Sequence, residues 1–389
     1  MKNTISKTIP YMLLLLALLL GSCASEPGTD RSIDAMAKSD QAELVVANKI
    51  DELYDDYATY YTREEYSLMF EEYQGSFGGV GISMVEIDNE VVVYGILKNS
   101  PASLTDIEPG DAILAVDGVS LKEADASAAA MLIRGEVGET VTLQLKRASD
   151  DSIYEVSIVR DTITSETVSG INLAAYPGTA YISISSFNEL TTSEFTEIYN
   201  SLYSERAIEN LIFDLRSNGG GNFFAAIAIG EYFVPINELV VSEKTASGTE
   251  SYRSSNGQLN DLNVIILQNA YTASASEVLI GAIKDEGHAT LVGTTTFGKG
   301  ITQNVAQLTS GSGHRYTRSI YYTPSSFSLH GIGLTPDIVV EDPEDGSAKD
   351  YFSYDPALNP HLAAALAYLF PDGPPGGDDG GNVGDASGE

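Results

Sequence analysis

The chain is poor in cysteine, histidine and basic residues, and each shortage excludes a class of protein. Its 389 residues include one cysteine, Cys23, so no intrachain disulfide can form. Lysine and arginine number 21 against 55 aspartate and glutamate, and the formal net charge of -34 disfavours nucleic acid and bare anionic membrane as partners. Four scattered histidines give no recognisable framework for a Ser-His-Asp triad. With one cysteine they form no metal-ligand set, so we expect no metal and no cofactor.

The N-terminus is predicted to be a targeting segment. Residues 11–20 form an apolar run behind Lys2 and Lys7, and this run is short for a mature membrane-spanning helix. The run ends in Leu-Gly-Ser-Cys at Cys23, which resembles the lipobox of bacterial lipoproteins. The alternative is a chance cysteine in an ordinary cleaved signal. The resemblance implies a lipoprotein signal peptide at 1–22, lipidation of Cys23, a tether at 23–40, and a location in the cell envelope, facing the periplasm or the exterior.

Helical patterns stand near both ends of the mature chain. Apolar residues recur at three- and four-residue spacing in residues 41–75, and Thr62-Arg63-Glu64-Glu65 is a helix start signal. A second helical segment is expected in residues 346–370, beginning at Asp355. Such stripes usually pack in a core, but these two could also make a homo-oligomer contact. The Gly- and Asp-rich residues 371–389 are expected to be disordered.

Residues 76–162 have the pattern of a small β-rich domain. Strands are predicted at 81–85, 91–96, 112–116 and 141–146, with a helix at 124–134. A glycine-rich loop before the first strand can offer backbone N–H groups to a peptide carboxylate while the strand edge pairs with the peptide. Such loops are common, but this one is accompanied by Ser-Pro-Ala, Glu-Pro-Gly-Asp and Val-Asp-Gly turns. Together they resemble a PDZ domain. The loop consists of Phe77, Gly78, Gly79, Val80, Gly81 and Ile82.

Two strand–loop–helix units follow. The first places a strand at 211–216, the glycine loop 217–221 and a helix at 223–233. Glycines allow close backbone approach to a substrate, and a helix N-terminus offers N–H groups to a negative oxygen. A phosphate-binding loop would need a Gly-Lys-Ser/Thr ending, which this loop lacks. An ordinary glycine loop is the remaining alternative.

The second unit carries Ser274, between a strand at 264–267 and a helix at 277–284. A serine and a desolvated lysine can together make a hydrolase, and Lys299 stands 25 residues later. The local pattern alone favours structural roles for both residues. Ser274 and Glu277 fit a capping box, and a lysine between two glycines usually points out of a turn. Gln303 could orient the lysine or simply belong to the next strand.

These motifs, taken in order, resemble the C-terminal processing peptidases, also called tail-specific proteases. The resemblance runs from about residue 54 to 369 and includes the 25-residue spacing of the serine and lysine. Its further motifs are Ser185-Ser186-Phe187, Asp214-Leu215-Arg216, Asn218 with Gly220-Gly221, Thr296-Phe297-Gly298-Lys299-Gly300, Tyr321-Tyr322-Thr323-Pro324, and Gly333 with Pro336-Asp337.

The resemblance assigns a role to each matching position. Ser274 would be the nucleophile, Lys299 the general base, and Gln303 the residue that holds the lysine. The N–H groups of Gly220 and Ala275 would form the oxyanion hole. The loop from Phe77 to Ile82 would receive the free C-terminus of a substrate, and Arg134 would link peptide binding to activation. A solvated arginine at a helix end is an equal alternative for Arg134.

The sequence thus predicts an α/β (α+β) protein, with a crotonase-like peptidase core at 163–345, an inserted PDZ domain and N-terminal helices. The predicted activity is that of a lipid-anchored serine endopeptidase that cuts unstructured C-terminal tails. One rival is a catalytically silent PDZ protein that only captures tails. Another is a non-peptidase enzyme on a related core, for example one that processes acyl-CoA. Retention of Ser274 and Lys299 argues against the first, and the PDZ insertion argues against the second.

Overall fold

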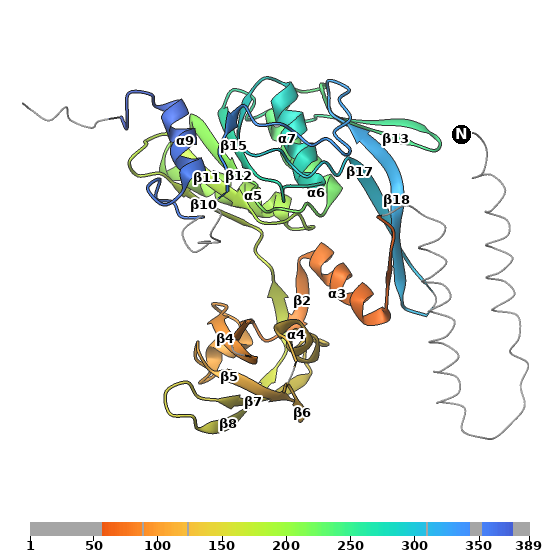
Figure 1. Ribbon diagram of the computed structural model, residues 1–389, viewed down its shortest axis with the longest axis vertical. Coiled ribbons are helices and arrows are strands. Elements are labelled where there is room, and N and C mark those ends of the chain that lie inside the picture. The colour runs from red at the N-terminus through yellow and green to blue at the C-terminus, as the bar shows by residue number, and fades with distance from the viewer. Residues whose placement is uncertain (1–56, 88, 123, 309, 343–351, 376–389) are drawn as a thin grey trace, which may run out of the picture. The chain divides into compact units, whose positions relative to one another are not determined.

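The computed structural model describes residues 57–342, apart from 88, 123 and 309, together with residues 352–375 (Figure 1). Cys23, the signal peptide, the tether, the helical pattern of 41–56 and the tail from 376 lie outside these residues and stay predictions. The described residues from Tyr61 onward belong to one compact unit. Within the described ranges, no helix is both long enough and apolar enough to cross a membrane.

Helix α3 (Arg63–Gln74) begins where the start signal predicts, after the short strand β1 (Thr59–Tyr61). The Thr62 hydroxyl accepts from the Glu65 N–H at 3.2 Å, and the Glu65 carboxylate accepts from the Thr62 N–H at 2.8 Å. This reciprocal pair satisfies two of the helix's unpaired donors. Gly75, at a φ of 78°, ends the helix in the left-handed conformation.

The next region is a β-rich domain around its own core. Its main sheet has the order β3-β4-β5-β7-β8, with β6 on β5, and β2 pairs separately with β9. Alternate residues of its strand β7 (Thr140–Lys146) are buried, as expected in a half-buried antiparallel sheet. The elements are β2 (Ser76–Gly79), β3 (Ile82–Ile87), β4 (Glu90–Ile96), the 3-10 helix η2 (Pro101–Leu104), β5 (Ala112–Val116), β6 (Val119–Ser120), α4 (Ala126–Ile133), β7 (Thr140–Lys146), β8 (Ile153–Val159) and β9 (Asp161–Thr164).

A six-stranded sheet forms the centre of the second domain, in the order β10-β11-β12-β15-β16-β19. Strand β10 is antiparallel to its neighbour, and all the other pairs are parallel. A parallel sheet must be covered on both faces. The strands are β10 (Val168–Asn172), β11 (Thr179–Ile184), β12 (Asn210–Asp214), β15 (Asn263–Gln268), β16 (Ala289–Gly293) and β19 (Ile338–Val339).

Helices cover both faces of this sheet. Helices α5 (Thr191–Glu205), α6 (Phe223–Phe233) and α7 (Ala275–Asp285) share one apolar cluster with the sheet. Helix α9 (Pro360–Leu369) shares a second cluster on the other face, as Figure 1 shows. Strand β12 alternates between them, since Leu211 and Phe213 belong to the first cluster and Ile212 to the second. The predicted mixed α/β class is therefore confirmed.

A second sheet flanks the first. Strand β18 (Gly313–Tyr322) lies between β17 (Ile301–Gln307) and β13 (Leu239–Thr245), and β13 also pairs with β14 (Gly248–Arg253). In the central sheet, Asp214 at the end of β12 is in register with Leu267 near the end of β15. The loops after these two strands therefore leave the same edge of the sheet, where open α/β sheets bind their ligands.

The predicted start of the C-terminal helix was wrong by five residues. Asp355 accepts from the Ala357 N–H at 2.9 Å and forms a turn, and helix α9 begins only at Pro360. Proline suits the first helical position, where no N–H is needed. Asn359 precedes it in an extended conformation and accepts from the Leu362 N–H at 3.1 Å, so this asparagine caps the helix.

Candidate active site

Ser274 stands between β15 and α7 in an unusual backbone conformation. Its φ is 58° and its ψ is -117°, which few residues other than glycine adopt. Strain of this kind persists only where the surroundings impose it, and it is concentrated at functional sites. Ser274 is half-buried and directly precedes the first turn of α7, where N–H groups lack intrahelical acceptors. A nucleophile placed here lies beside donors for a negative oxygen.

Lys299 lies in the loop between β16 and β17 and is also half-buried. Burial lowers the pKa of its ammonium group below the usual value, and the positive charge of Arg315 lowers it further. Both causes favour the neutral amine, which is the form that can accept a proton. Gln303 lies on β17, next to a register shift between Thr302 and Gln303. Its contact with the lysine stays a prediction.

A single carboxylate ties the serine loop to the lysine loop. One oxygen of Glu277 accepts from the N–H groups of Ser274 at 2.9 Å and Lys299 at 2.8 Å. Its other oxygen accepts from the Gly298 N–H at 2.7 Å and from the Thr296 hydroxyl. Glu277 is fully buried, and burial raises its pKa in spite of these hydrogen bonds. From the sequence, Glu277 had no role beyond capping its helix, whereas in the structure it joins the two loops.

Tyr321 joins the same two loops through their carbonyl groups, whereas Glu277 joins them through their N–H groups. Its single hydroxyl proton is shared between the carbonyl oxygens of Ser274 and Lys299, each 2.9 Å from the hydroxyl oxygen. Burial raises the pKa of Tyr321 well above its usual value, and the negative Glu277 adds to this, so the hydroxyl stays a donor. The sequence motif that contains Tyr321 pointed to the family but gave it no role. Together Glu277 and Tyr321 fix both the N–H and the carbonyl groups of the two candidate catalytic residues.

The glycine loop after β12 touches the candidate nucleophile. Gly220 has a φ of 102°, and a Cβ there would lie 2.8 Å from the Ser274 Cβ and 2.9 Å from the Ala275 nitrogen. Only glycine permits this approach. The Gly220 N–H donates to the Asn218 side-chain oxygen at 2.9 Å, so it can serve an oxyanion only when that bond opens or is shared. Ala275 is the first residue of α7, where the N–H has no intrahelical acceptor.

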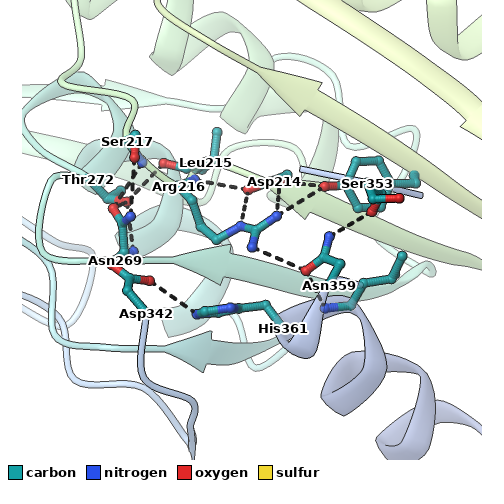
Figure 2. Close-up of polar contacts among 12 residues, drawn as sticks. Asp214, Leu215, Arg216, Ser217, Asn269, Thr272, Asp342, Ser353, Asn359 and His361 are labelled. Carbon is teal, nitrogen blue, oxygen red and sulfur yellow. Dashed lines mark hydrogen bonds and ion pairs between the residues drawn. The ribbon is translucent and has the colours of Figure 1, made fainter. Parts of the chain in front are cut away.

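A buried ion pair supports this glycine loop (Figure 2). The Arg216 guanidinium donates to both oxygens of Asp214, at 2.9 and 2.6 Å, and both side chains are almost fully buried. Arg216 also donates to Asn359 at 3.2 Å, which joins the pair to the cap of α9. The Tyr181 hydroxyl donates to Asp214. A desolvated pair survives only when its members are bonded in this way, and this one anchors the strand end from which the loop departs.

The glycine loop is also tied directly to the segment that leads to Ser274. The Ser217 N–H donates to the Asn269 side chain at 2.9 Å, and the Thr272 hydroxyl donates to the Leu215 carbonyl at 2.8 Å, as Figure 2 shows. The Ala273 N–H donates to the Asn218 carbonyl at 3.0 Å. The loops of the two strand–loop–helix units, which the sequence predicts separately, are therefore hydrogen-bonded to each other at one edge of the sheet.

Most of the predicted peptide-binding loop is strand in the structure, because Phe77, Gly78 and Gly79 lie in β2, which pairs with β9, and Ile82 begins β3. Val80 and Gly81 link the two strands and have little freedom. The carbonyls of Val80 and Gly81 accept from the N–H groups of Ala102 at 2.8 Å and Leu97 at 2.9 Å. Gly81 has a φ of 78°, and a Cβ there would lie 2.2 Å from the Ser100 Cβ. Strand β3 begins at Ile82, and α4 contacts it. A fixed loop at the head of a strand with a helix beside it is the arrangement that receives a peptide end.

Arg134, the residue that ends α4, is not a freely solvated side chain. Its guanidinium stacks over the Phe77 ring at 4.1 Å from the centroid, and it approaches the Glu71 carboxylate of α3 at 3.4 Å. The adjacent Gly135 donates its N–H to the Gly78 carbonyl at 3.1 Å. Arg134 therefore connects the peptide-binding loop with the helix that precedes it.

Comparison with known proteins gives the same assignment for both domains. Residues 178–340 match the model of peptidase family S41, and residues 78–158 match a PDZ domain. A probable CtpA-like serine protease of Staphylococcus haemolyticus is 31% identical over 78% of this chain, and the chain spans 60% of that relative's length. A solved S41 protease from Bacteroides fragilis shares the fold, with a TM-score of 0.51 at 16% identity over 95% of this chain and 98% of that one.

A carboxyl-terminal-processing protease of Picosynechococcus is 33% identical over 305 residues, which cover 77% of this chain and 73% of that relative. The serine loop, the lysine loop and the glycine loop meet within the part of the chain that matches the peptidase family. This chain therefore belongs to peptidase family S41, among the PDZ-containing carboxyl-terminal-processing proteases.

Proposed function

We propose that this chain is a serine endopeptidase that binds the C-terminal tails of unfolded proteins and hydrolyses them with Ser274 and Lys299. One observation carries the proposal. The strained Ser274 and the desolvated Lys299 are fixed to each other through both the Glu277 carboxylate and the Tyr321 hydroxyl. A scaffold that only captured tails would not need these two loops held so closely.

The proposed reaction assigns one step to each of these groups. The Ser274 hydroxyl attacks the scissile carbonyl, and the neutral Lys299 amine takes the hydroxyl proton. The Ala275 N–H, joined by the Gly220 N–H when it turns from Asn218, stabilises the oxyanion. Lys299 then gives its proton to the leaving amine, and water hydrolyses the acyl-enzyme with Lys299 again as base. Each oxyanion donor typically contributes about 10²–10³ in rate, and the general base about 10²–10⁴.

The PDZ domain would supply the substrate. Its loop from Phe77 to Ile82 suits the carboxylate of a peptide C-terminus, and β3 offers an edge for the rest of the tail. Because Arg134 contacts both Phe77 and Glu71, a bound tail could be sensed through this arginine. An Arg134→Ala variant should then bind tails but lose stimulation by them, whereas a purely structural arginine would leave stimulation unchanged.

The location of the protein belongs to the same proposal. The lipobox at Cys23 supports lipid anchorage in the cell envelope, facing the periplasm or the exterior. Metabolic labelling with a palmitate analogue tests it, because a Cys23→Ala variant should lose the label. Self-association through the terminal helices is also proposed, and sedimentation of the purified chain measures it.

Cleavage of an unfolded protein with an apolar C-terminus tests the proposed activity. The wild-type chain should release fragments, while Ser274→Ala and Lys299→Ala should not. If Ser274→Ala bound the tail and the wild type never cut it, the chain would be a silent tail-binding protein. If the Ser274→Ala and wild-type chains cut equally, the assignment of the nucleophile would be wrong.

A further inference from the structure

A buried carboxylate joins the strands of the second sheet. Glu243 stands on β13 and is fully buried. One of its oxygens accepts from the Thr302 hydroxyl of β17 at 2.9 Å and from the Ser319 hydroxyl of β18. Its other oxygen accepts from the Tyr252 hydroxyl of β14 at 2.7 Å. A buried charge costs much free energy unless it is hydrogen-bonded in this way, and these bonds connect all four strands.

The same carboxylate lies in the row of residues that holds the lysine loop. Glu243 is in register with Tyr321 of β18, whose hydroxyl oxygen lies 2.9 Å from the Lys299 carbonyl oxygen. On the other side of β18, the Tyr321 N–H donates to the Gly300 carbonyl at 3.1 Å. The bond from Thr302 to Glu243 therefore reaches across β18, from the strand that directly follows Lys299.

Strands β17 and β18 change register beside this carboxylate. Thr302 pairs with Ser319. The next residue of β17, Gln303, pairs with Thr317, two positions away on β18. Arg318 is therefore the extra residue of a β-bulge, a feature that redirects the side chains of a strand and is frequent next to active sites.

The extra residue of the bulge is bound to Glu243. The Arg318 guanidinium lies 3.3 Å from the Glu243 carboxylate and 2.9 Å from the Glu250 carboxylate of β14. The Glu250 side chain is 46% exposed, so water and salt weaken its attraction for the arginine. Glu243 is buried, and its attraction is screened much less. The buried carboxylate is therefore the stronger anchor of the bulge.

The bulge determines the face of the sheet on which Arg315 lies. Arg315 pairs with Val305, two residues after Gln303, so these three side chains share one face. Without the extra residue, the pairing beyond the bulge would shift by one position, and Arg315 would pair with Ala306 on the opposite face. The positive charge of Arg315 acts on Lys299 and lowers the pKa of its ammonium group. The bulge therefore keeps this charge within reach of the lysine.

We propose that Glu243 is a positioning residue for the general base Lys299, and that it acts by holding the β-bulge of β18 in place. This inference rests on the proposed peptidase activity, in which Lys299 is the base. Glu243 acts through other residues, on β17 through the Thr302 hydroxyl and on the bulge through Arg318. The alternative is a carboxylate that only stabilises the sheet and has no effect on the lysine of the folded protein.

The variant Glu243→Gln tests the inference by the direction of a pH shift. The amide oxygen can keep the two hydroxyl bonds, but the amide has no charge to hold Arg318. When the bulge loosens, Arg315 moves away from Lys299 and the pKa of the lysine rises. The increase of kcat/KM with pH should then move to higher pH. Loss of a nearby negative charge would by itself move it to lower pH, because that charge favours the ammonium form.

Three variants make the test specific. Glu250→Gln removes an equal charge from the same arginine at an exposed position, so it should leave the pH profile unchanged. Thr302→Val removes the hydroxyl that bonds Glu243. It should lower kcat roughly tenfold with a smaller change in KM, since a misplacement of 1 Å can cost about 10²-fold. Thr302→Ser should recover most of this loss. Glu277 and Tyr321, which also contact the lysine loop, are the same in every variant.

A titration followed by NMR measures the same effect without any substrate. Lysines of the full chain are ¹³C-methylated, and the signal that is missing from Lys299→Ala belongs to Lys299. The pKa of this amine should be higher in Glu243→Gln and in Thr302→Val than in the wild type, and unchanged in Glu250→Gln. Thermal melting shows which variants are folded. If Glu243→Gln does not fold, the comparison of Thr302→Val with Thr302→Ser decides.

The outcomes separate this inference from the proposed activity. A wild type that cuts no peptide defeats the proposed activity, whereas the titration still measures the effect of Glu243 on Lys299. An unchanged or lowered pKa of Lys299 in folded Glu243→Gln overturns the positioning role. Equal losses of kcat in Thr302→Val and Thr302→Ser overturn it too. A raised pKa in Glu243→Gln, together with the wild-type pKa in Glu250→Gln, supports it.

Discussion

Replacing Glu277 separates the hydrogen bonds of this residue from its charge. In Glu277→Gln the amide can turn in two ways. If its nitrogen replaces the oxygen that serves Ser274 and Lys299, both backbone N–H groups lose their acceptor. If it replaces the other oxygen, Gly298 is the only backbone N–H left without its acceptor, because the Thr296 hydroxyl oxygen, which already accepts from the Leu334 N–H, can turn and accept from the amide as well. The second orientation should be the more stable, and it keeps the hydrogen bonds from the Ser274 and Lys299 N–H groups.

The magnitudes follow from this count. One buried unsatisfied N–H costs about 1–3 kcal/mol, and removing the buried charge offsets part of that. We therefore expect Glu277→Gln to lower the free energy of unfolding by about 1–2 kcal/mol. Glu277→Ala leaves three N–H groups and one hydroxyl without an acceptor, and we expect a loss of at least about 4 kcal/mol.

Urea unfolding and peptide cleavage, measured on the same samples, check this prediction. Glu277→Gln should retain at least about a tenth of the wild-type kcat, and Glu277→Ala should retain less than about a hundredth, since small misplacements of reacting groups cost about 10²-fold. Equal urea midpoints for the two variants, or a fully active Glu277→Ala, would refute the role given to the carboxylate.

Three further predictions concern Lys299, Tyr321 and Gly81. Because burial and then Arg315 lower the pKa of Lys299, kcat/KM should rise with pH through that pKa; Arg315→Gln should move the rise to higher pH, and Arg315→Lys should not. Tyr321→Phe should lower the free energy of unfolding, measured in urea, by about 1 kcal/mol. It should also lower kcat several-fold, with a smaller change in KM. Gly81→Ala should weaken tail binding, measured by fluorescence anisotropy, at least tenfold, and adding Ser100→Gly should recover part of it.

Local sequence patterns predicted the elements of this chain better than the contacts between them. Helix α6 has the predicted bounds, and α3 begins at the predicted start signal, because hydrophobic periodicity and capping act over a few residues. The C-terminal helix was predicted to begin at Asp355, since a turn there offers the same Asp-Pro signal as a helix start. Asn359, the residue that caps it, also accepts from Arg216, far away in the sequence.

In the candidate site, too, contacts between residues far apart in the sequence could not be predicted from local patterns. The family resemblance predicted Ser274 as nucleophile and Lys299 as base, whereas the local pattern indicated that Glu277 caps its own helix. Its bonds to Thr296, Gly298 and Lys299 depend on a loop about twenty residues away, which only the tertiary fold brings near. Tyr321 is 47 residues from Ser274 and could not be placed by spacing. The Asn218 bond to the Gly220 N–H, which qualifies the oxyanion hole, also needed the folded geometry.

The central claim is that Ser274 attacks the substrate and Lys299 takes its proton. Acid quenching during turnover of an activated ester, followed by peptide mass spectrometry, tests it most directly. The account predicts an acyl adduct on Ser274 in the wild type, none in Ser274→Ala, and formation slowed about 10²–10⁴-fold in Lys299→Ala. An adduct on a different residue, or one formed at the wild-type rate in Lys299→Ala, would contradict it.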